Sequence, residues 1–308
     1  MAGAKVVCLM GATGTGKTEA AIRLAEALRG AVVNVDSRQV YAGVAVLTAQ
    51  PTSDEKARCP HFLYGDTSLD APVCAGDFAK RARAVVTTLV DQGLLPLLVG
   101  GTGLYFRAIL GGLAPIPAVP DTVRRAVQED FKRLGPLAMH DRLTAVDPEA
   151  ARRIAPADRQ RVTRALEVFA ATGRPLSDWH KQADPQAPGY DVLKIGLTVP
   201  MEALLPRLAR RIEAMAEAGA LAEVSRALAR YPVDAPGLTG IGGPELAAHL
   251  AGTTGLAEAK AAWLANTRAY AKRQMTWFRK ESDVVWLAPS DHAGILQTVR
   301  DWLGSART

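Results

Sequence analysis

The stretch GATGTGKT, residues 11–18, decides the fold of this 308-residue chain. It fits G-x-x-x-x-G-K-[ST], a glycine-rich loop between a strand and a helix that holds phosphates with its backbone N–H groups. The flanks agree, because residues 6–10 form an apolar run of strand length and residues 19–29 show helical spacing, with Gly30 expected to end the helix. The stretch predicts a di- or triphosphate site without choosing between them.

The residue types of this loop have distinct expected roles. Lys17 is expected to reach the outer phosphate, and the Thr18 hydroxyl is expected to coordinate Mg²⁺. The glycines let the backbone curl around phosphate oxygens, and the helix N-terminus adds partial positive charge. The predicted diphosphate-binding residues are Gly11, Ala12, Thr13, Gly14, Thr15, Gly16, Lys17 and Thr18.

The first hundred residues alternate strands with helices. Residues 31–35 and 94–99 are short apolar runs typical of strands, and residues 77–92 are typical of a helix. This alternation predicts an α/β fold of the P-loop NTPase type, a parallel sheet with helices on both faces and ligands beyond the carboxyl ends of its strands. Polar segments at residues 36–41 and 100–105 follow two of these ends.

A Pro- and Gly-rich linker at residues 111–120 interrupts the alternation. The predicted helices after it are residues 121–134, 136–144, 148–154 and 156–172. A return strand at residues 192–199 and a helix at 201–218 follow. The sequence thus predicts a catalytic core of residues 1–112 and 191–308, with an inserted all-helical lobe of residues 113–190.

Composition places the chain among globular proteins, with 48% apolar and 22% charged residues. The three widely spaced cysteines predict reduced thiols in a cytoplasmic protein, and the five histidines lack zinc-ligand spacing. Mg²⁺ accompanying the phosphates is therefore the metal expected. No signal peptide or bilayer-length apolar stretch is evident, so no membrane partner is expected.

Residues 266–280 concentrate the net charge of +6, with five basic, no acidic and three aromatic side chains. A solvated amphipathic helix with an aromatic inner face would account for this pattern, but the charge favours a helix that also follows RNA phosphates. Tyr270, Gln274 and Trp277 share one helical face and are expected to pack inward. The basic side chains expected to stay exposed are Arg268, Lys272, Arg273 and Arg279.

Asp36 is the carboxylate expected to face the phosphates, because the strand at residues 94–99 ends in Gly-Gly-Thr without an acid. A hydrolytic phosphate-loop enzyme normally has a second acid at such a strand end. The simpler alternative for Asp36 is a cap or turn residue. Thr102 is either a turn residue or a donor that stabilises leaving-group charge.

Six motifs occur in this order: GATGTGKT (11–18), DSRQVY (36–41), PLLVGGTGLYF (96–106), DPEAARRIAPADRQRVTRALEV (147–168), TGRPLS (172–177) and TRAYAKRQMTWFRK (267–280). Together they resemble the tRNA dimethylallyltransferase, or tRNA isopentenyltransferase, family over nearly the whole chain. The resemblance implies transfer of a dimethylallyl group from dimethylallyl diphosphate to the N6 amine of the tRNA adenosine just 3′ of the anticodon (position 37). It also implies a monomer that releases diphosphate.

The resemblance also implies roles for individual residues. Asp36 matches the base that accepts the proton of the adenine amine, and Arg207 and Arg211 match a basic pair at the diphosphate. With Thr102, the implied catalytic residues are Asp36, Thr102, Arg207 and Arg211. The implied tRNA contacts, with the basic segment included, are Asp36, Ser37, Arg38, Gln39, Thr102, Arg124, Gln160, Arg161, Val162, Thr163, Arg164, Arg268, Lys272 and Arg273.

Two stretches depart from the family pattern. Leu47 and Gln50 replace a glycine and a lysine after the DSRQVY motif, and Gly243 and Pro244 replace a Tyr-Lys pair. Neither departure touches the implied chemistry, but both put the local loop geometry in question.

Three other functions fit parts of the chain. A small-molecule kinase would use Asp36 on a substrate hydroxyl and the helical lobe as a lid, but it leaves the basic segment without a role. A prenyltransferase of free adenine nucleotides would need neither the lobe nor that segment. An ATP-dependent RNA-binding module would normally carry the acid that is missing after residue 99.

Overall fold

The structure is a computed structural model that describes residues 3–182 and 187–305. It divides into two compact units. Unit 1 contains the described residues up to 110 and from 188 onward, and unit 2 contains those between 111 and 187. The sequence places these limits at 113 and 190. The two units are described separately below.

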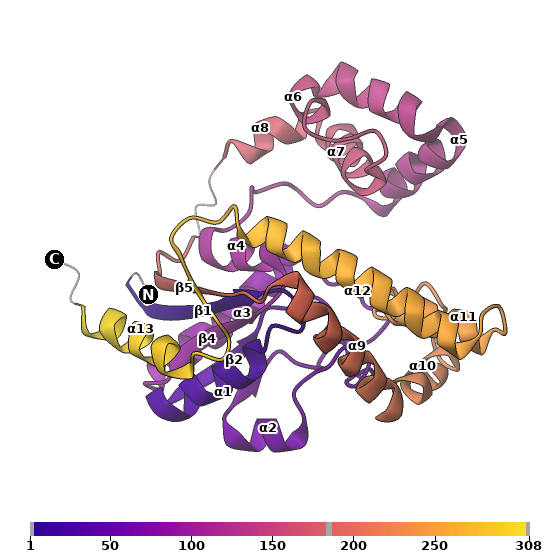
Figure 1. Cartoon of the computed structure of the whole chain (residues 1–308). Helices are drawn as coiled ribbons and strands as arrows, with labels where there is room; N and C mark the ends of the chain where they lie inside the picture. Colours follow the sequence, from indigo (N-terminus) through magenta and orange to yellow (C-terminus); the bar gives the residue numbers. More distant parts are fainter. Residues whose placement is uncertain (1–2, 183–186, 306–308) are drawn as a thin grey trace. The chain divides into compact units, whose positions relative to one another are not determined.

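One parallel sheet forms the centre of unit 1, with the strand order β3-β2-β4-β1-β5-β6 (Figure 1). Its strands are β1 (Lys5–Gly11), β2 (Gly30–Asn34), β3 (His61–Phe62), β4 (Leu95–Gly100), β5 (Asp191–Leu197) and β6 (Val284–Leu287). The predicted fold class is confirmed, and the return strand pairs with β1 as β5. The edge strands β3 and β6 are not predicted, because runs of two and four residues carry no readable periodicity.

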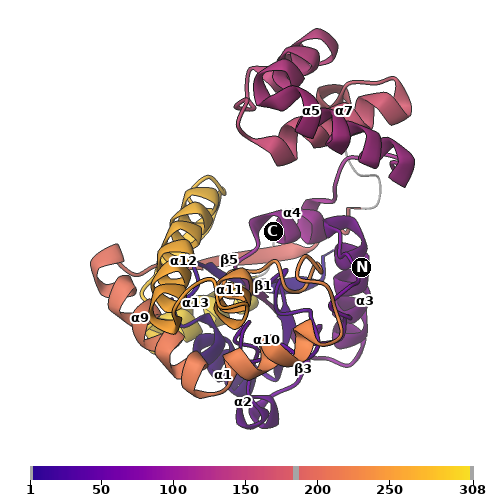
Figure 2. The ribbon, with the colours of Figure 1, turned by 90° about the vertical axis from the view of Figure 1, so that its right-hand side faces the viewer.

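Both faces of this sheet are covered by helices. Val7 and Leu9 of β1 share an apolar core with α1 (Lys17–Leu28) and α13 (His292–Gly304). Val6 and Cys8 are also fully buried, and the strand pleat turns them to the opposite face, where α3 (Ala75–Asp91) and α4 (Gly103–Gly111) lie (Figure 2). Burial on both faces explains why these strands have continuous apolar sequences.

The predicted role of Gly30 is wrong. Arg29 ends α1 instead, in a left-handed conformation with φ 51° and ψ 51°, and its N–H donates to the Ala25 carbonyl. Gly30 is the first residue of β2, where a Cβ would lie 3.1 Å from the Leu95 carbonyl oxygen. Glycine therefore serves the close approach of β2 to β4 at this position.

Two long helices, α9 (Met201–Glu217) and α12 (Leu256–Phe278), pack against each other beside the end of β1. Ala12, in the loop after β1, lies in an apolar cluster with Leu204 and Leu208 of α9 and Ala271 of α12. The two helices thus hold one side of the phosphate loop. The shorter helices of unit 1 are α2 (Ser53–Arg58), α10 (Ala220–Leu228) and α11 (Gly243–Leu250).

Unit 2 is helical, as the sequence predicts, and has its own apolar core. Its helices are α5 (Asp121–Val146), α6 (Pro148–Ala151), α7 (Arg159–Thr172) and α8 (Leu176–His180). Helix α5 breaks at Gly135, with φ 80° and ψ 173°, at the predicted boundary between two helices. The predicted start of α7 at Pro156 is wrong, because the Asp158 carboxylate caps the helix by accepting the Arg161 N–H. No helix of the described ranges is long and apolar enough to cross a membrane.

Candidate active site

The phosphate loop wraps around the N-terminus of α1. Gly16 precedes the helix with φ 85°, a left-handed conformation that favours glycine. The Lys17 Nζ donates to the carbonyl oxygens of Gly11 at 3.0 Å and Ala12 at 2.7 Å, so this side chain lies back over the loop. Thr15 is buried and donates its hydroxyl to the Ala12 carbonyl at 2.9 Å. The side chains of Thr15 and Ala12 therefore shape the loop, and the predicted contacts of these two residues with a diphosphate stay a prediction.

Asp36 lies just beyond the end of β2 in a tightly bonded turn. Its carboxylate accepts the Arg38 N–H at 2.8 Å, so Asp36 does form the turn that was its simpler alternative. The Asp36 N–H donates to the Asn34 side-chain oxygen at 2.9 Å. The Asn34 amide in turn donates to the carbonyls of Asp36 at 3.2 Å and Leu63 at 2.9 Å. Asn34 is fully buried, so it holds the Asp36 backbone in place.

Three charged side chains from distant segments influence one another at this site. Burial lowers the pKa of Lys17 to about 8, while the negative charge of Asp36 raises it and the positive charge of Arg211 lowers it further. Burial also lowers the pKa of the Arg211 guanidinium, again opposed by Asp36. The structure thus brings Lys17, Asp36 and Arg211 together. Arg207, one turn earlier on α9, is exposed.

Thr102 ties the loop after β4 to the loop after β2. Its hydroxyl oxygen accepts the Ser37 N–H at 3.1 Å, and its own N–H donates to the Val35 carbonyl at 3.2 Å. The Tyr270 side chain of α12 lies beside Thr102. Burial raises the pKa of Tyr270 to about 12, with a further rise from the Asp36 charge. Tyr270 therefore belongs to this site, whereas its aromatic character and spacing predict only an inward-facing side chain.

Arg38 and Gln39, the implied contacts of the target base, both bond to neighbouring loops. The Arg38 guanidinium donates to the Pro236 carbonyl at 3.0 Å and to the Thr239 hydroxyl at 3.2 Å. The Gln39 amide donates to the Ala49 carbonyl at 2.6 Å. In this structure both side chains brace the walls of the site. Their contact with a base stays a prediction.

Leu47 and Gln50, the first departure from the family pattern, lie in a loop that side-chain hydrogen bonds hold in place. The Gln50 amide donates to the Tyr41 carbonyl at 2.7 Å. The buried Glu223 carboxylate accepts the N–H groups of Val46 at 3.0 Å and Leu47 at 2.8 Å. Side-chain bonds therefore fix the backbone of this loop from two directions.

The second departure suits the start of α11. A Cβ at Gly243 would overlap the Leu238 carbonyl oxygen, so this loop conformation requires glycine. Pro244 lies in the first turn of the helix, where its missing N–H costs nothing.

In unit 2, the implied tRNA contacts divide between surface and core. Gln160 and Arg161 are exposed, whereas Val162 is fully buried and Thr163 donates its hydroxyl to the Arg159 carbonyl at 2.9 Å. The side chains of Val162 and Thr163 thus belong to the lobe's own core. The predicted contact of residues 160–164 with tRNA stays a prediction, with Gln160 and Arg161 as its exposed members.

Two other implied tRNA contacts of unit 2, Arg124 and Arg164, influence the pKa of the buried Glu167 carboxyl. Burial raises the pKa of Glu167, and the charges of Arg164 and Arg124 oppose this rise. Both arginines therefore lie near Glu167, on α5 and α7.

Helix α12 has the predicted division of faces. Gln274 is 5% exposed and Tyr270 and Trp277 are half-buried, while the basic side chains of the other faces are exposed. Those exposed side chains are Arg268, Lys272, Arg273 and Arg279. The prediction that one helix carries both an aromatic inner face and a basic outer face is confirmed.

The magnesium ion that is expected to accompany the phosphates stays a prediction. Among the described residues, no cluster of three or more His, Cys, Asp or Glu side chains could hold a metal. Mg²⁺ bound to a diphosphate needs few protein ligands. The half-buried Thr18 hydroxyl at the start of α1 suits that role.

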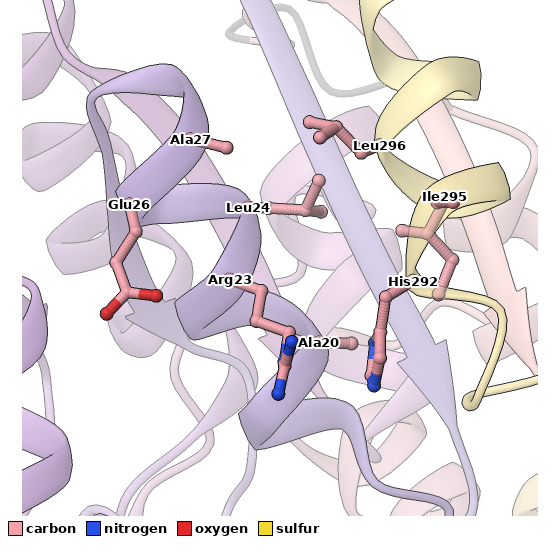
Figure 3. Close-up of a pocket in the computed structure, with 9 residues that line it drawn as sticks. Ala20, Arg23, Leu24, Glu26, Ala27, His292, Ile295 and Leu296 are labelled. Carbon is pink, nitrogen blue, oxygen red and sulfur yellow. The ribbon is translucent and has the colours of Figure 1, made fainter.

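A separate hollow of about 460 Å³ lies between α1 and α13 (Figure 3). Its walls are mostly apolar, with Leu24 and Leu296 among them, and Arg23 and His292 approach each other at one end. None of the predicted site residues lines this hollow. This hollow is therefore not part of the candidate site at the ends of β1, β2 and β4.

The fold and this site are those of a phosphate-loop α/β protein with a carboxylate, Asp36, beside the loop that is expected to hold phosphates. A family model described as IPP transferase matches residues 39–281. A tRNA dimethylallyltransferase of Nitratidesulfovibrio vulgaris strain DP4 is 50% identical over 97% of this chain and 96% of its own length. One of Geobacter sulfurreducens is 45% identical over 92% of this chain and 91% of its own.

Solved structures lead to the same family. The tRNA isopentenylpyrophosphate transferase of Bacillus halodurans superposes with a TM-score of 0.71 at 34% identity, covering 97% of this chain and 96% of that one. A eukaryotic dimethylallyltransferase acting on tRNA gives 0.80 at 26% identity, over 94% of this chain and 75% of that one. The chain belongs to the tRNA dimethylallyltransferase family, and the predicted family and enzyme class, a prenyltransferase, are confirmed.

Proposed function

We propose that this enzyme transfers a dimethylallyl group from dimethylallyl diphosphate to the N6 amine of the adenosine at position 37 of tRNA, 3′-adjacent to the anticodon. One observation carries the proposal: the Asp36 carboxylate acts electrostatically on Lys17 and Arg211, beside the phosphate loop. A carboxylate thus lies near two cationic side chains. This is what an amine attack with loss of diphosphate requires.

The chemistry follows from the reactants. The adenine N6 lone pair is delocalised into the ring, so the amine needs a proton acceptor as its bond to carbon forms. N6 attacks C1 of the dimethylallyl group, the C1–O bond breaks, and the N6 proton passes to the Asp36 carboxylate. Diphosphate leaves with the bonding electron pair. Lys17, Arg211 and the loop N–H groups stabilise its charge.

Thr18 would hold Mg²⁺ together with the diphosphate oxygens. The ion, when bound, would neutralise part of the diphosphate charge. Lys17 and Arg211 act on the same oxygens from the protein side.

The RNA substrate explains the basic surface of α12. The target base has to turn out of its stack, at a cost of a few kcal/mol. Phosphate contacts of Arg268, Lys272 and Arg273, together with exposed residues of unit 2, would offset that cost. Binding through phosphates also implies an affinity that falls with salt. We further infer a cytoplasmic protein, from its three widely spaced cysteines, and a monomer, because the family resemblance implies one.

A direct assay tests this proposal. The protein is incubated with Mg²⁺, dimethylallyl diphosphate and an unmodified tRNA with adenosine at position 37, and the RNA is analysed by mass spectrometry. A five-carbon adduct on that adenosine is expected. Phosphate transfer from ATP without an adduct would instead support a kinase and overturn the proposal.

A further inference from the structure

Gln274 connects the helix with the basic surface to both substrate loops. It lies on the inner face of α12 and is only 5% exposed. Its side-chain oxygen accepts the Thr13 N–H of the phosphate loop at 2.9 Å. Its side-chain nitrogen donates to the Gly101 carbonyl, next to Thr102, at 2.8 Å. One buried amide therefore joins the loops that follow β1 and β4.

The neighbours of Gln274 on the same helix face contact the same loop. Tyr270 lies beside Thr102, and the Trp277 indole packs where a Cβ at Gly103 would overlap it. A Cβ at Gly101 would likewise overlap the Gln274 amide. Positions 270, 274 and 277 are spaced as one helical stripe, so α12 contacts residues 101–103 through consecutive turns. Because Gly101 and Gly103 have no side chains, α12 packs directly against this loop.

The chemistry of these bonds requires an amide. The Thr13 N–H needs an acceptor and the Gly101 carbonyl needs a donor, and a glutamine side chain supplies both in a neutral group. Loss of either partner would leave a buried backbone group without a hydrogen bond. The bond to Thr13 also fixes an N–H at the start of the loop whose later N–H groups are expected to hold the diphosphate.

We propose that Gln274 is a positioning residue, which sets the phosphate loop and the Thr102 loop relative to each other. This inference rests on the proposed function, because it assigns the first loop to the diphosphate and the second, through Thr102, to the tRNA. Arg268, Lys272 and Arg273 project from the other faces of the same helix. RNA held on those faces therefore sits on the element that orders both loops.

The first test replaces the amide by an apolar chain of similar length, Gln274→Met. Both loops lose their bond, so the affinity for inorganic diphosphate in the presence of Mg²⁺ is expected to fall about tenfold or more. The single-turnover transfer rate should fall by at least as much. Thr276→Ala, on the exposed side of the same helix, is the matched control and should stay within about twofold of wild type.

A second variant, Gln274→Glu, separates positioning from packing. A protonated glutamic acid can accept from Thr13 and donate to Gly101, as glutamine does, whereas the ionised form has only acceptors. Its transfer rate relative to wild type should therefore fall as pH rises from 6 to 9. A residue that only fills space would give a pH-independent ratio. This readout also applies if the methionine variant fails to fold.

Two results would overturn the inference: unchanged diphosphate affinity in Gln274→Met, or a flat pH ratio in Gln274→Glu. The binding measurement needs no transfer. A wild-type protein that binds diphosphate but forms no adduct would count against the proposed function, and the affinities of the Gln274 variants would still decide the positioning role.

Discussion

The two units of this protein place their polar residues in opposite ways. The site in unit 1 joins Asp36, Thr102, Arg211 and Gln274, which come from four distant segments. Unit 2 is one continuous segment, and many of its ion pairs join residues three or four positions apart. Those pairs include Arg124 with Asp121, Arg133 with Asp130, Arg153 with Glu149, and Arg161 with Asp158.

The polar side chains of the two units also differ in what they contribute to stability. Exposed ion pairs of unit 2 contribute little to stability, because water screens them. Its buried polar anchor is Asp147, whose carboxylate accepts the N–H groups of Ala150 and Ser177, each at 2.9 Å. In unit 1, buried Asn34 and Gln274 order the catalytic loops. Replacing one of the buried polar side chains of unit 1 should therefore lower the transfer rate. Replacing a polar side chain of unit 2 should instead change its stability or the affinity for tRNA.

The largest expected effect is that of Asp36→Asn. The asparagine keeps the size of the side chain but cannot accept the amine proton, so the single-turnover rate should fall about 10²- to 10⁴-fold. Diphosphate affinity, measured by titration, should change little. A large loss of that affinity, matching the loss of rate, would show that Asp36 acts in binding and is not the base.

Asp147→Asn should destabilise unit 2 by about 2 kcal/mol, roughly 30-fold in its unfolding equilibrium, because one buried N–H loses its acceptor. Hydrogen exchange of α5 and α7 amides measures this change. Equal acceleration of exchange in the β-sheet of unit 1 would contradict the independence of the two units.

The pH dependence of this effect has a definite sign. Burial acts to raise the pKa of Asp147, but the N–H groups of Ser177 and Ala150 hold it below its ordinary value. The contribution of the carboxylate is then present above the unfolded-state pKa of about 3.9 and is lost as pH falls through the lower folded value. The difference between wild type and Asp147→Asn should shrink under acid conditions.

Lys17 should make diphosphate binding depend on pH. Its pKa is about 8 in the free protein, and a bound anion raises it. Below pH 8, Lys17 is already protonated before the diphosphate binds. Above that pH, protonation must accompany binding, and affinity should fall by up to about tenfold per pH unit. Lys17→Met should bind weakly at all pH values, and persistence of the same slope in this variant would assign it to another group.

The smallest expected effect is that of Arg161→Ala in unit 2. Loss of one phosphate contact should weaken tRNA binding a few-fold and reduce the salt slope by about one, while kcat at saturating tRNA is unchanged. Arg153→Ala is the matched control, because Arg153 is exposed, forms a local ion pair and is not an implied contact. Equal losses in both variants would mean that general charge, and not this position, holds the RNA.

Much of the fold follows from local sequence patterns. The phosphate loop, the strands β1, β2, β4 and β5, and the break at Gly135 all depend on periodicity or turn chemistry within short windows. The prediction that Gly30 ends α1 is wrong because glycine is favoured both after a helix and where two strands approach closely, and here the second reason applies. At the edge of the described sheet, β6 pairs with β5, so its existence depends on a partner ninety positions away in the chain.

The sequence by itself determined the family, the reaction class and the residues with chemistry to offer, because motif spacing records which side chains must recur. Only the tertiary structure decided that Asn34 and Gln274 order the catalytic loops, and that Val162 and Thr163 belong to a core. The physical reason is that a buried amide has no periodicity of its own. Its role depends on which backbone groups, brought close by the sheet and by α12, lack another partner.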